Sequence, residues 1–412
     1  MKSPQASSIE VVQGPLLLEG VRIARISTVP FFIIAQLAAQ VEALVAQGAA
    51  VTIVSSDGPE LRGRNPIAGA HWTAIEIPRS LSPFKDLLAL LRLFFFFKRT
   101  RTQIAHSSTP KAGLLTALAA YLAGVPVRVH TFTGQPWVNM RGFKRWLVRG
   151  CDRLIGLLNT VCYADSPSQR EFLLAEGLLP PGKLKVIGAG SLAGVDVDRF
   201  SRARFSAESC VALRQSLGIG AHIPVLLFVG RITAEKGIRE LMQAFAGVKR
   251  QGSTAHLLIV GQFDDDGGMP GSITREEITR HADAHIIGYT ERPEAYMAIA
   301  DILCLPSYRE GFGTVVIEAA SLGVPTVGSH IYGLSDAVKQ GETGLLVDPR
   351  DSASLQAALL QLLADDALRA RMGLAARQRA YTLFDAKRVN AAVVQDYASL
   401  LGALRETPER QP

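Results

Sequence analysis

A strand–helix–strand succession near the start of the chain constrains the fold more than any other feature. Residues 22–28 predict a strand, residues 29–47 a helix that ends at Gly48, and residues 50–55 a second strand. Strands joined through a helix in this way run parallel, and a parallel sheet is covered by helices on both faces. The sequence therefore predicts an α/β fold.

The second half of the chain repeats this alternation, and 412 residues are too many for one hydrophobic core. Residues 123–127 and 322–326 even share the order of helix end, turn and strand. We therefore predict two Rossmann-like domains, over residues 1–200 and 201–385, which face each other across a central cleft. The last segment, residues 386–412, is expected to contain a helix that crosses back to the first domain.

Composition narrows the class of protein. Hydrophobic residues make up 48% and charged residues 20%, which is typical of a globular chain. Lys and Arg (44) outnumber Asp and Glu (37), which suits an anionic substrate, an anionic membrane surface or nucleic acid. Nucleic acid is not expected as a partner, because no aromatic-interleaved RNA motif or zinc-finger spacing is present.

Targeting and redox features indicate a cytoplasmic protein. Residues 1–13 are polar and lack the apolar region of a signal peptide, and no apolar run reaches the ~20 residues of a membrane span. The four cysteines lack metal-ligand spacing and are expected to be reduced. We expect a protein that is soluble or lies on a membrane surface.

The stretch from Pro306 to Pro325 carries the strongest functional signal. A buried strand, Ile302 to Leu305, leads into a loop in which Gly311 and Gly313 allow a close turn. Thr314 is the predicted cap of a helix that Gly323 ends. The pattern predicts a tight turn from strand to helix at one edge of the sheet.

Two carboxylates flank this helix start. Glu310 lies in the loop and Glu318 about one turn inside the helix, roughly 10 Å apart for a rise of ~1.5 Å per residue. Amides at a helix start favour an anion, so a phosphate can lie between two acidic groups that hold sugar hydroxyls. We interpret this as a nucleotide-sugar pocket. The alternative is a solvated helix entry with two surface glutamates.

A second loop, Gly230 to Gly237, follows the strand predicted over residues 224–229. It carries Arg231 and Lys236, two fixed cations that suit a diphosphate. Tyr289 follows another short strand, where a base or ribose would lie. The acidic run 264–266 lacks the spaced ligands of a calcium loop, so we predict a solvated loop and no metal site.

The first half of the chain offers residues for an acceptor. His106 ends a strand and Lys111 opens the next helix, so both are placed to meet an acceptor phosphate or hydroxyl. A structural role for His106 is the alternative. The first strand is followed by Val29-Pro30-Phe31 in place of a glycine-rich turn, which argues against a dinucleotide at this point.

Two helical segments raise the question of a membrane. Four arginines recur every fourth residue and would form one cationic stripe that suits anionic lipid or a lipid diphosphate: Arg141, Arg145, Arg149 and Arg153. The run Phe94 to Phe97 next to basic residues would be a membrane-contacting edge. A solvated face and a buried core helix remain the respective alternatives.

With the two loops in hand, the chain resembles the family 4 retaining glycosyltransferases of the GT-B fold, from Arg22 to Leu401. Their E-x7-E motif corresponds to Glu310 to Glu318, and their Gly-Arg…Glu-Lys-Gly motif to Gly230 to Gly237. The resemblance implies a hexosyltransferase that takes a nucleotide-diphosphate sugar such as a UDP-sugar and needs no metal ion or other cofactor.

The resemblance also assigns roles to residues of the second half. Arg231 and Lys236 would bind the donor diphosphate, Glu318 the ribose hydroxyls, and Glu310 the transferred sugar. The complete donor set, which includes the backbone around the helix start, would be Gly230, Arg231, Lys236, Tyr289, Glu310, Phe312, Gly313, Thr314 and Glu318.

Transferases of polysaccharide and lipopolysaccharide biosynthesis resemble the chain further, at residues 106–113 and 190–196. This implies an acceptor glycan linked to lipid, usually polyprenyl diphosphate, at the inner face of the cytoplasmic membrane. The products would be lipopolysaccharide, O-antigen or exopolysaccharide. A UDP-sugar epimerase of similar layout and a non-catalytic membrane-surface scaffold are the two rival functions.

The chain departs from the family at its active-site histidine. The usual Thr-x-His-Gly pattern is Thr131-Phe132-Thr133-Gly134 here, so the histidine position falls on Thr133. His130 stands three residues earlier. We predict that His130 is near the reacting centre and that Thr133 lies on the acceptor side, with Glu310, Arg231 and Lys236 as the other catalytic residues.

Overall fold

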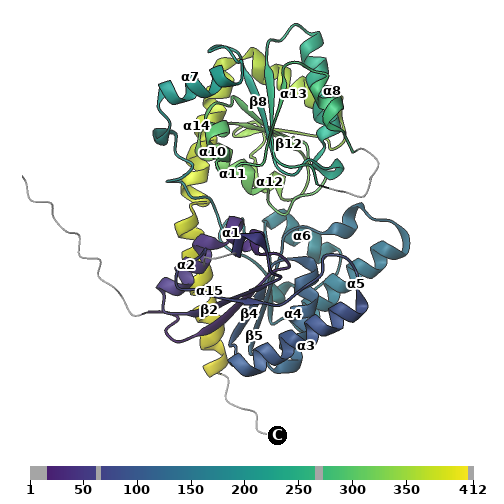
Figure 1. Ribbon diagram of the computed structural model, residues 1–412, viewed down its shortest axis with the longest axis vertical. Helices are drawn as coiled ribbons and strands as arrows, with labels where there is room; N and C mark the ends of the chain where they lie inside the picture. The colour runs from purple at the N-terminus through teal and green to yellow at the C-terminus, as the bar shows by residue number, and fades with distance from the viewer. Residues whose placement is uncertain (1–15, 62–65, 265–271, 407–412) are drawn as a thin grey trace, which may run out of the picture.

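The computed structural model describes residues 16–61, 66–264 and 272–406. It consists of two α/β domains, each with a parallel sheet between helices, that follow one another along the longest axis of the molecule (Figure 1). The predicted fold class, two Rossmann-like domains, is confirmed.

The N-terminal domain contains a seven-stranded sheet in the order β3-β2-β1-β4-β5-β6-β7, and all its strand pairs are parallel. The strands are β1 (Arg22–Ile26), β2 (Ala50–Ser55), β3 (His71–Ala74), β4 (Ile104–Ser107), β5 (Val127–Phe132), β6 (Val161–Ala164) and β7 (Leu184–Val186). The helices are α1 (Pro30–Gln36), α2 (Ala38–Ala46), α3 (Pro83–Thr100), α4 (Pro110–Ala123), α5 (Gly142–Leu158) and α6 (Pro167–Ala175).

The C-terminal domain contains a six-stranded parallel sheet in the order β10-β9-β8-β11-β12-β13. Its strands are β8 (Val225–Val229), β9 (His256–Val260), β10 (Ala284–Gly288), β11 (Ile302–Leu305), β12 (Thr326–Ser329) and β13 (Gly344–Val347). Its helices are α7 (Ala207–Ser216), α8 (Ile238–Arg250), α9 (Arg275–Thr279), α10 (Pro293–Ala298), α11 (Thr314–Ser321), α12 (Leu334–Ala337), α13 (Ser352–Ala364) and α14 (Asp366–Leu383).

The last helix, α15 (Ala386–Glu406), leaves the C-terminal domain and lies along the N-terminal one, as its yellow ribbon shows in Figure 1. Val393 and Tyr397 of this helix are buried in the core that covers one face of the first sheet. Where the chain passes between domains, the amide of Val195 donates to the carbonyl of Phe384 at 2.7 Å. The two crossings of the chain are therefore hydrogen-bonded to each other, and α15 ties the domains together.

Two local predictions differ from the structure. The helix predicted over residues 29–47 is divided into α1 and α2, because Leu37 leaves helical geometry (φ −123°, ψ 1°). Of the four phenylalanines at the end of α3, Phe97 is buried in the core, whereas Phe95 is 64% exposed. The run is therefore partly core and partly surface, and its contact with a membrane stays a prediction.

Candidate functional site

The turn into α11 is built on glycine. Gly313, with φ +86°, is the residue that caps α11, and Thr314 is its first helical residue without a side-chain capping bond. The prediction of Thr314 as the cap is thus wrong, because the turn needs the left-handed conformation that glycine adopts readily. A Cβ at Gly313 would also lie 2.6 Å from the Leu334 side chain. Residues 306–313 form the loop between β11 and α11, and Gly313 closes it against Leu334.

Lys236 and Glu310 meet at this turn. The Lys236 ammonium lies 2.5 Å from Oε1 of Glu310, and the two side chains are only 16% and 14% exposed. The loops that carry them pack closely, because a Cβ at Gly237 would lie 2.1 Å from the carbonyl oxygen of Pro306. The predicted proximity of these two charged residues, from loops after β8 and β11, is therefore observed.

Arg231 lies at the outer edge of the same group. Its guanidinium contacts Asp264 at 2.6 Å and Glu235 at 3.4 Å, and its side chain is 58% exposed. Glu235 also pairs with Arg309 at 2.9 Å. Burial opposes ionisation of Glu235, but Arg309, Lys236 and Arg231 outweigh it and lower its pKa. Glu235 thus holds Arg231 and Arg309 on either side, a role that the sequence did not reveal.

Glu318 projects from the middle of α11. Burial raises the pKa of its carboxyl to about 7, Arg199 opposes this shift, and Glu294 adds to it. Arg199 and Glu294 themselves form an ion pair at 2.9 Å. Near neutral pH this carboxyl is therefore partly protonated, and it can accept a hydrogen bond from a hydroxyl group or donate one to it.

Tyr289, which follows β10, faces the N-terminal domain. Its ring meets that of Phe31 in α1 edge-on, with 6.1 Å between centroids, and the two residues are 52% and 43% exposed. The Val29-Pro30-Phe31 turn therefore places an aromatic ring opposite the residue predicted to lie near the base.

The domains also touch beside Glu310. A Cβ at Gly134 would lie 3.1 Å from Nη1 of Arg309, and one at Gly311 would lie 2.8 Å from the carbonyl carbon of Thr133. Thr133 is therefore next to the loop that carries Glu310, and its role on the acceptor side stays a prediction. The Phe312 side chain is buried against Phe384. Phe312 could therefore contact a donor only through its backbone.

His130 lies elsewhere. It is 2% exposed, and its Nδ1 lies 2.9 Å from the Ser107 hydroxyl. A Cβ at Gly113 of α4 would lie 2.4 Å from its ring, so the imidazole fills the space that this glycine leaves. Burial lowers the pKa of His130 to about 3, which keeps the ring neutral. The structure thus places the ring inside the N-terminal domain, and its predicted place near the reacting centre stays a prediction.

His106 and Lys111 are both engaged within the N-terminal domain. His106 is 1% exposed, with Nε2 2.7 Å from the Thr131 hydroxyl and Nδ1 in contact with Arg25 and Tyr397. Lys111 pairs with Asp86 of α3 at 2.7 Å. The structural alternative for His106 is thus supported, and neither side chain is directed at an acceptor in this state.

The arginine stripe on α5 is divided. Arg149 and Arg145 contact Glu176, which follows α6, at 3.0 and 3.9 Å. Arg141 immediately precedes the helix, and Arg153 is exposed. Glu176 therefore pairs with the middle of the predicted cationic stripe, and the contact of that stripe with anionic lipid or a lipid diphosphate stays a prediction. Large apolar side chains are exposed on the same helix: Phe143, Trp146, Leu147, Leu154 and Leu157.

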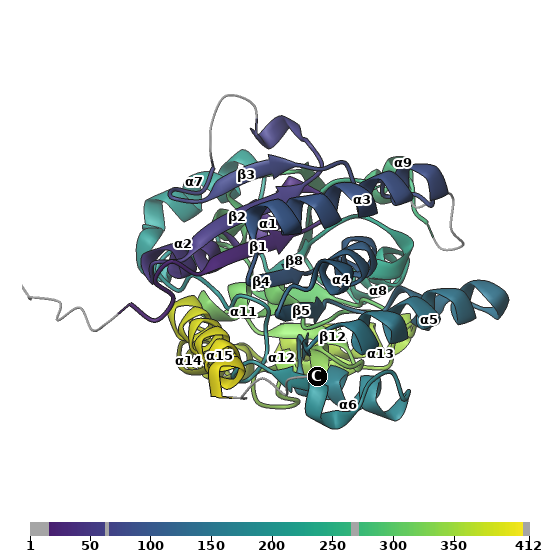
Figure 2. The same ribbon diagram turned by 90° about the horizontal axis from the view of Figure 1, so that it is seen from below.

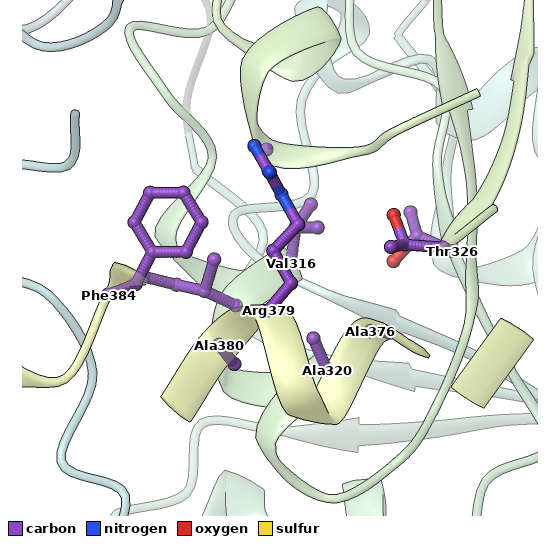
Figure 3. A pocket seen from close by; sticks show the side chains of 10 residues that line it. Val316, Ala320, Thr326, Ala376, Arg379, Ala380 and Phe384 are labelled. Atoms are coloured by element: carbon purple, nitrogen blue, oxygen red, sulfur yellow. The ribbon is translucent and has the colours of Figure 1, made fainter. Parts of the chain in front are cut away.

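A polar and aromatic contact joins α6 to α12. Oδ2 of Asp336 accepts a hydrogen bond from the Ser168 amide at 2.9 Å, and the rings of Phe172 and Tyr332 stack with 4.8 Å between centroids. A cavity of about 10 Å³ lies between α11 and α14. The Arg379 side chain extends along this cavity (Figure 3). The cavity has room for about one water molecule, and none of the predicted donor residues lines it.

The sequence-based reasoning missed Asp165. This residue follows β6 at the same edge of the sheet as Thr133, and it is 8% exposed. The sequence did contain a signal for this residue. Asp165 directly follows a buried strand, and Glu310 lies in the loop after another buried strand. Among the described residues, no group of three or more His, Cys, Asp or Glu side chains has the arrangement of a metal site. The predicted solvated loop at Asp265 and Asp266 lies outside the described residues.

Within residues 16–61, 66–264 and 272–406, the structure contains no helix with the length and apolar character needed to span a bilayer.

Known proteins match both halves of the chain. The family model for the glycosyl transferase 4-like domain matches residues 33–190, and that for glycosyl transferases group 1 matches residues 212–379. The capsular polysaccharide biosynthesis glycosyltransferase CapM of Staphylococcus aureus is 30% identical over 351 residues, which represent 84% of this chain and 89% of CapM.

Solved structures agree on the fold. The Anabaena protein HepE, in its complex with UDP and glucose, superimposes with a TM-score of 0.76 at 19% identity and covers 92% of this chain and 100% of HepE. A glycosyltransferase from Rickettsia africae gives 0.74 at 20% identity, with 93% and 99% coverage. Together with the relationship to CapM, these matches show that the chain belongs to the family 4, or group 1, glycosyltransferases.

Proposed function

We propose that this glycosyltransferase moves a sugar from a UDP-sugar to a lipid-linked glycan, with retention at the anomeric carbon. The observation that carries the proposal is the partly buried Lys236–Glu310 pair just before α11, the helix that also holds Glu318. HepE structures with UDP and UDP-glucose support the choice of donor. The name of CapM supports an acceptor in bacterial polysaccharide biosynthesis.

The donor diphosphate would lie between Lys236, Arg231 and the first turn of α11. Negative charge grows on this diphosphate as the sugar leaves, so cations and helix amides that are already in place lower the barrier. Glu318 would accept hydrogen bonds from the ribose, and Glu310 from a hydroxyl of the transferred sugar. The low exposure of Lys236 strengthens its interaction, because little water screens it.

The acceptor hydroxyl would attack from the face that the diphosphate leaves, and its proton would pass to the departing phosphate oxygen. In this scheme Lys236, Arg231 and the α11 amides take the place of a metal ion. Contacts such as Ser168–Asp336 would hold the domains together around the bound donor and keep water from the reaction.

The function is tested by incubating the protein with a panel of nucleotide sugars and a polyprenyl-diphosphate-linked acceptor. We expect a UDP-sugar to yield a product whose mass is increased by one sugar residue. Conversion of the UDP-sugar without an acceptor would instead favour an epimerase. Absence of both turnover and UDP binding would favour a non-catalytic scaffold and would overturn the proposal.

We further propose that one side of the N-terminal domain docks on the cytoplasmic membrane surface. Helices α3, α4 and α5 lie in a row there (Figure 2). We define the docking face by exposed apolar residues of α3 and α5: Phe84, Leu87, Leu91, Phe95, Phe143 and Trp146. Exposed basic residues on α5, Lys144 and Arg153, accompany them. Apolar side chains beside cations suit the interface of an anionic bilayer.

Vesicle sedimentation tests the docking face. Phe143→Ser/Trp146→Ser should weaken binding to vesicles that contain anionic lipid, and Lys144→Gln/Arg153→Gln should weaken it more at low salt than at high salt. Leu374→Ser, which removes an exposed apolar residue of the other domain, is the control. Equal sedimentation of all variants with the vesicles would contradict the proposal.

A further inference from the structure

Helix α6 of the N-terminal domain and helix α12 of the C-terminal domain meet where the two domains face each other (Figure 1). Ser168 lies in the first turn of α6, where amide groups have no carbonyl partner within the helix. Its amide donates to Oδ2 of Asp336 at 2.9 Å, and its hydroxyl contacts the same oxygen. A carboxylate at a helix start is favourable, because it accepts from free amides and complements the helix dipole. Asp336 thus binds the start of a helix that belongs to the other domain.

The Ser168 hydroxyl makes a second contact between the domains. Its oxygen accepts a hydrogen bond at 2.8 Å from the amide of Gly333, the residue that precedes α12. A hydroxyl group donates one proton and also accepts, so Ser168 can bind Asp336 and Gly333 at the same time. Beside it, Phe172 of α6 stacks on Tyr332 with 4.8 Å between ring centroids. We call these five residues the latch: Ser168, Phe172, Tyr332, Gly333 and Asp336.

Gly333 also touches the loop that carries Glu310. A Cβ at Gly333 would lie 2.5 Å from the carbonyl oxygen of Gly311 and 2.8 Å from that of Glu310. Its φ of +83° favours glycine as well, so both space and conformation require this residue here. The same loop meets the N-terminal domain directly, since a Cβ at Gly311 would lie 2.8 Å from the carbonyl carbon of Thr133. The position of Glu310 therefore depends on residues of both domains.

These contacts form a continuous path from α6 to the charged pair. Ser168 is bonded to the Gly333 amide, and the Gly333 backbone packs on the Glu310 backbone. Oε1 of Glu310 in turn lies 2.5 Å from the Lys236 ammonium. A misplacement of about 1 Å in an active site can cost roughly a hundredfold in rate. A contact that fixes this loop should therefore affect the reaction strongly.

We propose that the latch positions Glu310 for sugar transfer, by holding the two domains in the arrangement that fixes the Glu310 loop. The inference rests on the proposed function, which places the transferred sugar at Glu310. Ser168 and Asp336 are positioning residues, because they act on Glu310 through Gly333. Their loss should slow transfer, whereas the diphosphate contacts within the C-terminal domain remain.

Steady-state kinetics of Ser168→Ala, Asp336→Ala and the double variant test the inference, with the UDP-sugar and acceptor that the wild-type protein uses. Each single substitution should lower kcat about tenfold, as loss of a hydrogen bond to a charged group implies. The KM for the UDP-sugar, and the UDP affinity measured by calorimetry, should stay within about twofold of wild type, because donor binding is kept. The double variant should lose at most about twofold more than the single ones, because all three break one contact.

Small-angle X-ray scattering provides a measurement that needs no substrate. Without ligand, the radius of gyration of Ser168→Ala/Asp336→Ala should exceed that of the wild-type protein, because the domains separate when the latch is lost. An unchanged radius of gyration would overturn the inference.

Asp351→Ala is the matched control. The Asp351 carboxylate also binds a helix start, since it accepts from the amides of Ala353 and Ser354 at 2.9 and 3.0 Å, but this helix, α13, lies in the same domain. Its loss should change neither kcat nor the radius of gyration. Should an alanine variant of the latch fail to fold, Asp336→Asn, which removes only the charge, should still lower kcat.

Three kinetic results would also overturn the inference. These are a wild-type kcat in the latch variants, additive losses in the double variant, and a loss of UDP affinity as large as that of kcat. Absence of sugar transfer by the wild-type protein would instead refute the proposed function, and the scattering comparison would still test whether the latch holds the domains.

Discussion

Replacement of Lys236 by alanine is the perturbation with the largest predicted effect. Its ammonium is 16% exposed and 2.5 Å from Glu310, so the variant loses a desolvated cation and leaves a carboxylate unpaired. Removing one such electrostatic donor typically costs about 2–4 kcal/mol in the transition state, which is roughly thirty- to a thousandfold in kcat/KM. Binding of UDP should weaken as well, because Glu310 would then repel the diphosphate.

Calorimetry with UDP and the rate of UDP release in the presence of acceptor measure these two losses. Lys339→Ala is the control, since Lys339 and Glu342 form an ion pair whose side chains are 59% and 52% exposed. Lys236→Ala/Glu310→Gln should bind UDP more tightly than Lys236→Ala, because the repelling charge is gone. The reasoning is refuted if Lys236→Ala keeps wild-type UDP affinity and rate within about twofold.

Three further predictions follow from the same site. Glu318→Gln should remove the rise in UDP-glucose affinity that we expect between pH 6 and pH 8, where the Glu318 carboxyl, with a pKa of about 7, becomes ionised; calorimetry at both pH values checks this. Asp165 has a folded-state pKa raised to about 7, so its contribution to stability is lost as the pH rises from about 4 through 7. Asp165→Asn should therefore be more stable than wild type at pH 8 by at most about 4 kcal/mol, with little difference at pH 4, as measured by urea denaturation. Treatment with EDTA should leave the transfer rate unchanged if the cations of the donor site act in place of a metal ion.

Features of the site that follow from strand order could be predicted from the sequence. Features that depend on how helices and strands pack against one another could not. Lys236 and Glu310 could be paired because each follows a strand of one parallel sheet, and β8 and β11 are neighbours in it. The pairing of the α5 arginines with an acidic residue could not be predicted, because Glu176, which contacts Arg149, lies at the end of a different helix, α6. Spacing along one helix shows which side chains share a face, but it does not show what lies against that face.

The burial of the histidines could not be predicted for a similar reason. Alternation along a strand shows only that successive side chains point to opposite faces of the sheet. His130 can lie in the interior because Gly113 of α4 leaves a space that the imidazole ring fills. Asp165 was overlooked because an aspartate before Ser166 and Pro167 also resembles an ordinary helix start. Its importance becomes visible only once the other domain places Gly311 against it.

A crystal structure of the protein with UDP tests the central claim most directly. The account predicts density for the two phosphates at the start of α11, within hydrogen-bond distance of Lys236, with the ribose hydroxyls on Glu318. UDP bound elsewhere, or bound here with Lys236 still turned away from the phosphates toward Glu310 alone, would contradict it.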